Sequence, residues 1–124
     1  MRKYISTNNA LNRGRPLSQA VRHGNLVFIS GQAAIDPATG ELIEGFKDQV
    51  IQTIENLLSV LEAAGGKKED LIKLTVFLND IGKFEMFNQI YKGYFDTDPP
   101  ARSCVEVNLV GSFEVEIEGI AIVE

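Results

Sequence analysis

The feature that most constrains the fold is an amphipathic segment over residues 46–61, in which apolar side chains recur at spacings of three and four. This spacing predicts a helix with a single apolar face, which must pack against another element. Gly65 and Gly66 follow the segment and can cap the helix at its C-terminus. The apolar positions are Phe46, Val50, Ile54, Leu57, Leu58 and Leu61.

Other segments alternate apolar and polar residues, a pattern that favours strands. The predicted strands are residues 3–6, the two arms of a hairpin that turns at His23-Gly24-Asn25, and residues 70–79, 101–109 and 113–123. A second helix with aromatic side chains lies between two of these strands, and Pro99-Pro100 prevents it from continuing. This order predicts one α+β domain over residues 1–124, with two helices laid on one face of a mixed sheet.

The last two predicted strands each have an apolar face and a mixed face, because successive side chains of a strand point to opposite sides. We expect Ala101, Ser103 and Val105 to face the core. The mixed face is expected to carry Arg102, Cys104, Glu106, Glu114, Glu116, Glu118, Ile120 and Ile122. A face that combines charges with isoleucines is poorly suited to water, so we expect a second subunit to cover it.

The composition argues against several classes of function. A net charge of −5 does not favour a nucleic-acid surface, because such binding depends on Lys and Arg neutralising phosphates. One cysteine excludes an internal disulfide, and one cysteine with one histidine cannot form a usual zinc site. The longest apolar run, residues 26–29, is too short to cross a bilayer, and residues 1–10 lack the apolar region of a signal peptide. We expect a soluble, cytoplasmic protein.

Seven motifs occur in order along nearly the whole chain. They are SGQ at 30–32, DPATGEL at 36–42, ENLLSVLEAAG at 55–65, TVFLND at 75–80, FNQIY at 87–91, PARSCVEV at 100–107 and VEIEGIAI at 115–122. Together they resemble the RidA family, also called the YjgF-type family. The resemblance implies a chorismate-mutase-like α+β sandwich, a homotrimer with a central barrel, and active sites in the clefts between subunits. It also implies hydrolysis of 2-iminobutanoate and 2-iminopropanoate, released by pyridoxal-phosphate enzymes, to 2-oxo acids and ammonia.

Two residues of these motifs suit that chemistry. A planar guanidinium binds a carboxylate through two parallel hydrogen bonds, so Arg102 is the candidate that clamps the substrate. Attack of water on the C=N carbon needs a positioned proton acceptor, and Glu116 matches the water-orienting position of the family. No metal or organic cofactor is required, because an imine is already electrophilic.

The resemblance implies five further residues of the substrate site. Cys104 is expected to line it, partly through its backbone, and Asn88 matches the asparagine of the family. Ser30 and Gly31 lie at a strand end, where glycine lets the backbone approach a ligand closely. Leu17 replaces the pocket tyrosine of members that have Gly-Pro-Tyr-Ser-Gln-Ala, which makes the pocket more apolar and either favours longer aliphatic imines or weakens turnover.

Structural alternatives exist for these assignments. Arg102 could be an ion-pair partner, Glu118 shares the face of Glu116, a bulge would also explain Gly31, and Leu17 could be a core residue. Three functions therefore stand open: an imine deaminase, a non-catalytic trimer that binds small carboxylates such as 2-oxo acids, and an RNA-directed activity. Only turnover separates the first two. The negative net charge and the single histidine argue against an RNA-directed activity.

Overall fold

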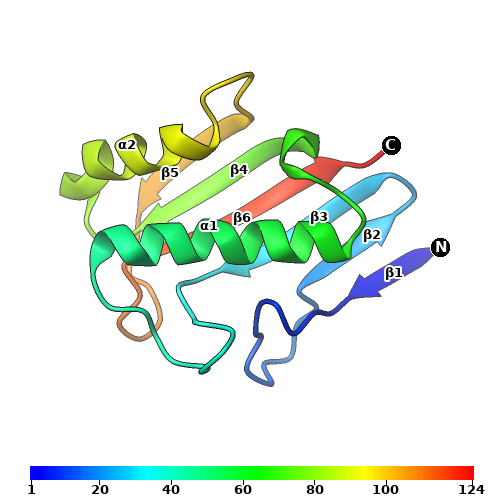
Figure 1. Cartoon of the computed structure of the whole chain (residues 1–124), viewed down its shortest axis with the longest axis horizontal. Coiled ribbons are helices and arrows are strands. Elements are labelled where there is room, and N and C mark those ends of the chain that lie inside the picture. Colours follow the sequence, from blue (N-terminus) through cyan, green and yellow to red (C-terminus); the bar gives the residue numbers. More distant parts are fainter.

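The computed structural model describes residues 1–124 and has two layers, a six-stranded sheet and two helices that cover one of its faces (Figure 1). The elements are β1 (Arg2–Ile5), β2 (Ala20–His23), β3 (Leu26–Gln32), α1 (Phe46–Ala63), β4 (Leu71–Leu78), α2 (Phe84–Tyr94), β5 (Ala101–Glu106) and β6 (Val115–Ile122). Two short 3-10 helices, Lys68–Asp70 and Ile81–Lys83, precede β4 and α2. The predicted α+β arrangement is confirmed.

The sheet is mixed, and its strands follow the order β1-β2-β3-β6-β4-β5. Only β4 and β5 are parallel, and α2 forms the crossover that such a pair requires. The last strand of the chain, β6, lies between β3 and β4 and pairs with both. The edge positions belong to β1 and β5.

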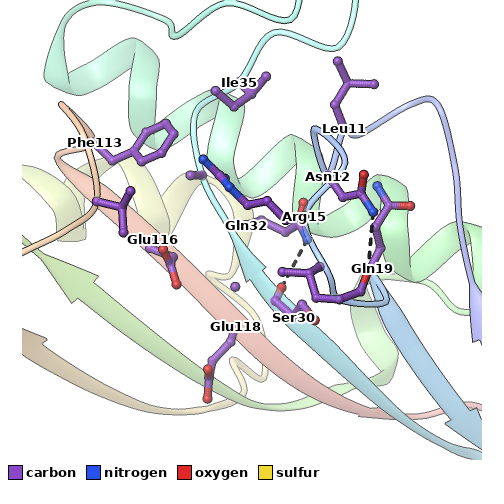
Figure 2. Close-up of a pocket in the computed structure, with 14 residues that line it drawn as sticks. Leu11, Asn12, Arg15, Gln19, Ser30, Gln32, Ile35, Phe113, Glu116 and Glu118 are labelled. Carbon is purple, nitrogen blue, oxygen red and sulfur yellow. Dashed lines mark hydrogen bonds between the residues drawn. The ribbon is translucent and has the colours of Figure 1, made fainter.

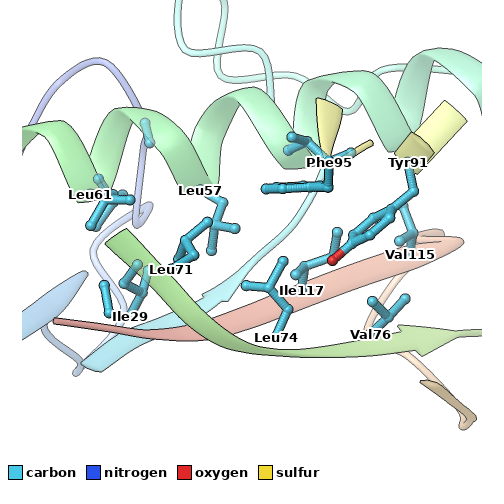
Figure 3. Packing of buried hydrophobic residues seen from close by; sticks show 14 of the residues in the cluster. Ile29, Leu57, Leu61, Leu71, Leu74, Val76, Tyr91, Phe95, Val115 and Ile117 are labelled. Atoms are coloured by element: carbon cyan, nitrogen blue, oxygen red, sulfur yellow. The ribbon is translucent and has the colours of Figure 1, made fainter. Parts of the chain in front are cut away.

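The core lies between the helices and the covered face of the sheet. Figure 3 shows Leu57 and Leu61 of α1 above the strands, together with Tyr91 of α2 and Phe95, which follows α2. The strand residues beneath them include Leu71, Leu74 and Val76 of β4 and Val115 and Ile117 of β6. The apolar stripe predicted for residues 46–61 is therefore the face of α1 that packs on the sheet. No helix is both long and apolar enough to span a membrane.

The predicted orientation of β5 is wrong. Leu74 and Val76 of β4 are fully buried beneath the helices, and their partners in the register are Arg102 and Cys104. Because neighbouring residues in a register share a face, Arg102 and Cys104 point to the helix side. Ser103 points to the open side. The alternation of apolar and polar residues does not report the orientation here, because β5 is an edge strand and neither of its faces is fully buried.

Two details of β4 and β6 follow from the register. Strict alternation with the buried Leu74 and Val76 would place Ile72 inside, but Ile72 is 44% exposed. The pairing of β4 with β6 shifts between Leu71 and Lys73 and turns Leu71 inward. In β6 the prediction is confirmed: Val115, Ile117 and Ala121 are buried, and the alternate residues face away from the helices.

The open face of the sheet, opposite the helices, carries exposed apolar side chains beside charges. Phe28 of β3 is 50% exposed and pairs with Ile120 of β6. Ile122 is 38% exposed and Val105 of β5 is 43% exposed. In a single chain this face is open to water, and its cover by a second subunit stays a prediction.

Candidate functional site

A pocket of about 430 Å³ lies between the loop that precedes β2, the C-terminal end of β3 and the β6 strand (Figure 2). Its lining residues are Leu11, Asn12, Arg15, Leu17, Gln19, Ser30, Gly31, Gln32, Ala33, Ile35, Val110, Phe113, Glu116 and Glu118. The pocket thus brings together four of the residues predicted from the sequence: Leu17, Ser30, Gly31 and Glu116. We call it the glutamate pocket.

The loop at the rim of the glutamate pocket is held by its own hydrogen bonds. Asn12 Oδ1 accepts a hydrogen bond from the Gly14 backbone N–H at 3.0 Å, and Asn12 O accepts one from the Arg15 N–H at 3.2 Å. Arg13 and Gly14 both have positive φ, which turns the chain sharply here. Leu17 is 47% exposed at the end of this loop, so it lines the pocket and is not a core residue.

A bulge in β3 shapes the floor of the pocket. The pairing of β3 with β6 shifts between Ile29 and Gln32, so Ser30 and Gly31 lie in the irregular part. The Ser30 hydroxyl donates a hydrogen bond to the Ser18 carbonyl at 2.6 Å, which ties the loop to the strand. A Cβ on Gly31 would lie only 2.2 Å from Glu116 Oε2. Gly31 therefore serves both as part of the bulge and as the space that the Glu116 carboxylate needs.

Glu116 is a half-buried carboxylate without a partner in the chain. The glutamates that accept hydrogen bonds are Glu55, Glu106 and Glu114, and the one ion pair joins Glu114 to Lys83. Burial raises the pKa of Glu116, the charge of Glu118 raises that pKa further, and the charge of Arg15 lowers it. A carboxylate with a raised pKa in a pocket is suited to accept a proton.

Arg102 lies elsewhere, on the helix side of β5, where three aromatic rings of α2 surround its guanidinium. The Arg102 Cζ atom is 4.8 Å from the ring centroid of Tyr91, 5.6 Å from that of Phe84 and 5.7 Å from that of Phe87. These cation–π contacts fix the guanidinium plane, while no carboxylate pairs with it in the chain. The N–H donors of Arg102 are therefore available, and the ion-pair alternative does not hold within one chain.

A second cavity, of about 360 Å³, adjoins this guanidinium and is lined by Asn88, Tyr91, Lys92, Phe95, Asp96, Pro99, Pro100 and Arg102. The Asn88 side-chain oxygen is buried and accepts no hydrogen bond, which is rare for a buried amide. The Tyr91 hydroxyl is also buried without a partner, and burial raises its pKa to about 12. Asn88 and Arg102 thus line the same cavity. We call this region the arginine cavity.

Cys104 lies two residues beyond Arg102 on the same side of β5 and packs against the core. Burial raises the pKa of the Cys104 thiol, and the charge of Arg102 lowers it by less. A thiol with a raised pKa is a poor nucleophile at neutral pH. The thiol is therefore not suited to act as a nucleophile, and the predicted role of Cys104 in lining the site stays a prediction.

Within one chain the predicted residues form two separate groups. Glu116 lies on the open face of the sheet, whereas Arg102 lies on the helix side. Arg15 belongs to none of the seven motifs, although it stands next to Pro16-Leu17 in the same departure from the Gly-Pro-Tyr pattern. The aromatic platform of Arg102 was not predicted from the sequence either. No group of three or more His, Cys, Asp or Glu side chains could hold a metal ion.

The chain belongs to the protein family described as Endoribonuclease L-PSP, which residues 7–123 match, and the resemblance to RidA proteins is confirmed. It is 46% identical over 123 residues to a RutC family protein of Pyrococcus horikoshii, with 98% of each chain covered. It is 41% identical over 126 residues to a protein of Salmonella typhimurium named 2-iminobutanoate/2-iminopropanoate deaminase, with 98% of each chain covered. The crystal structure of Escherichia coli TdcF with bound serine has a TM-score of 0.94 and 39% identity, covering 98% of this chain and 99% of that chain.

Proposed function

We propose that the protein is a 2-imino acid deaminase, which hydrolyses 2-iminobutanoate and 2-iminopropanoate to the 2-oxo acids and ammonia. The observation that carries the proposal is a pair of unpaired groups: the Glu116 carboxylate in the glutamate pocket and the Arg102 guanidinium at the arginine cavity. These are the proton acceptor and the carboxylate clamp that the reaction needs. The name of the Salmonella relative supports the same reaction class.

We infer that the two groups meet across a subunit interface, because they lie on opposite faces of one sheet. In the proposed homotrimer, the arginine cavity of one subunit lies against the glutamate pocket of the next, which joins Asn88 and Cys104 to Leu17, Ser30 and Gly31. The exposed apolar side chains of the open face support an assembly that buries this face around a central barrel. Light scattering should give a mass about three times the 13.7 kDa of the chain.

The proposed reaction begins when Arg102 binds the substrate carboxylate through two parallel hydrogen bonds and thereby fixes the C=N bond. Glu116 orients a water molecule and accepts its proton as the water oxygen attacks the C=N carbon. Glu116 returns this proton to the nitrogen, which gives the neutral 2-amino-2-hydroxy acid. The ionised Glu116 then accepts the hydroxyl proton and passes it to the amino nitrogen. The C–N bond then breaks, and ammonia and the 2-oxo acid leave. The rim residue Leu17 contacts the aliphatic side chain of the substrate.

The test of turnover is a coupled assay in which the protein is added to a threonine dehydratase reaction and the decay of the imine is followed. Faster imine decay supports the proposal, and Arg102→Ala and Glu116→Gln should each abolish the acceleration. If 2-oxo acids bind but imine decay is unchanged, the protein is the non-catalytic carboxylate binder. An RNA-directed activity is disfavoured by the two glutamates of the pocket and the net charge of −5.

Mixed assemblies test the shared site. When Arg102→Ala and Glu116→Gln chains are unfolded, combined in equal amounts and refolded, some interfaces receive both intact residues. In a cyclic oligomer with one site at each interface, random assembly restores about one quarter of the wild-type rate. The matched control is a mixture of the two proteins assembled separately, which should remain inactive. Inactive co-refolded oligomers would contradict the division of the site between subunits.

A further inference from the structure

Arg15 is the only cation that lines the glutamate pocket, and it shares this pocket with two carboxylates, those of Glu116 and Glu118. Its guanidinium forms no ion pair, and the only arginine side chain that donates a hydrogen bond is that of Arg22. Figure 2 shows the Arg15 side chain running from the loop across the pocket toward the side where Phe113 and Glu116 lie. Arg15 is thus unengaged yet directed into the site.

Within one chain, the other elements packed around Glu116 offer no competing cation nearby. In the proposed homotrimer Arg102 of the next subunit also lies against this pocket, and it is unchanged in every variant compared below. Along β6, Glu118 is two residues away on the same face. Beside Glu116 on β4 stands the uncharged Phe77, and on β3 the backbone of Gly31 approaches it. Lys73 lies farther along β4 on the open face, where its Nζ donates a hydrogen bond to Ser103 Oγ at 2.8 Å.

We propose that Arg15 is a positioning residue for Glu116. The Arg15 guanidinium keeps the Glu116 carboxylate ionised and therefore able to accept a proton from water. Burial and the charge of Glu118 both raise the pKa of Glu116, and Arg15 lowers it. Without the Arg15 charge, nothing in the chain opposes the increase of the Glu116 pKa by burial and by Glu118. The catalytic role of Arg15 rests on the proposed deaminase function. The effect of the Arg15 charge on the ionisation of Glu116 does not depend on turnover.

The experiment measures the titration of Glu116 directly, through the NMR signal of its side-chain carboxyl carbon, assigned by its loss in Glu116→Gln. In Arg15→Gln the titration midpoint should move to higher pH, and in Arg15→Lys, which keeps the charge, it should stay near the wild-type midpoint. Glu118→Gln should move it to lower pH, because a repulsive charge is removed. The matched control is Arg13→Gln, which removes the same charge from the same loop outside the pocket lining and should leave the midpoint in place.

The pH dependence of kcat/KM provides the second readout. Its acid limb should move to higher pH in Arg15→Gln, since less Glu116 is ionised at a given acidic pH. An unmoved Glu116 titration in Arg15→Gln, or an equal movement in Arg13→Gln, would overturn the proposal. A third result would also overturn the proposal: Arg15→Gln changes the preference for an imino acid with a second carboxylate, while the Glu116 titration stays fixed. Arg15 would then bind the substrate and not act on Glu116. If the wild type lacks deaminase activity, the proposed function fails, and the NMR titration still decides the electrostatic link.

Discussion

Replacing Gly31 by alanine tests whether Glu116 works from the position seen in the structure. The alanine Cβ would lie 2.2 Å from Glu116 Oε2 and 2.9 Å from its carboxyl carbon, whereas real Cβ contacts stay beyond 3.0 Å. The carboxylate is the end of a side chain and can rotate, so it should move by about 1 Å while the strands stay paired. Gly31 does not have a positive φ, so its backbone conformation suits alanine.

The expected loss in rate follows from this displacement. A misplacement of about 1 Å costs on the order of 100-fold in rate, which corresponds to about 2.7 kcal/mol of transition-state stabilisation. The measurements are kcat/KM for 2-iminobutanoate in the coupled assay, and the free energy of unfolding from urea titration. The rate should fall by about this factor, while the free energy of unfolding changes by less than about 1 kcal/mol.

A matched control is Gly93→Ala, near the C-terminal end of α2, where a Cβ would meet nothing within 4 Å. This variant should keep its activity and gain a little stability, because alanine favours a helix over glycine. Wild-type activity in Gly31→Ala would refute the reasoning, since the carboxylate cannot remain where it is with a Cβ in its place. Unfolding of Gly31→Ala would instead show that the bulge, and not the carboxylate, requires the glycine.

Three further predictions concern stability. Tyr91→Phe removes a buried hydroxyl without a partner and should raise the free energy of unfolding in urea by about 1 kcal/mol, while the ring beneath Arg102 is kept. Asn56→Ala should lower it by about 2–4 kcal/mol, because Asn56 donates hydrogen bonds to two backbone carbonyls at 2.9 Å beneath the pocket wall. Glu116→Gln should raise the melting temperature at pH 7. The pKa of Glu116 is raised in the folded state, so ionisation favours unfolding as pH rises through that pKa, and the advantage of glutamine should vanish below the ordinary value of 4.5.

Much of the fold could be predicted because its central elements are buried on a regular period. In α1, Val50, Ile54, Leu57 and Leu61 have no exposed surface, so the spacing of three and four reports their burial directly. The face of β6 could be predicted for the same reason, since it pairs on both sides and has one covered face.

Edge and irregular positions could not be predicted in this way. In β5, the apolar Val105 lies on the open face and the charged Arg102 on the helix side, because aromatic rings accept a guanidinium where the pattern suggests only apolar contacts. In β4, Leu71 and Ile72 are both apolar, and the shift in register decides which one is buried. Period-2 patterns contain no information about pairing register or about cation–π contacts.

The candidate site was harder to predict than the fold because its residues belong to two faces of one sheet. Two groups cost free energy in a single chain: the half-buried Glu116 carboxylate, which has no partner, and the buried Asn88 amide oxygen, which has no donor. The Arg102 guanidinium has no carboxylate to bind. Exposed apolar side chains on the open face add to this cost. The proposed assembly would cover that face and bring the unpaired groups to a shared ligand. The same contacts that stabilise the oligomer would then complete the site, so the chain would lose activity whenever it loses its neighbour.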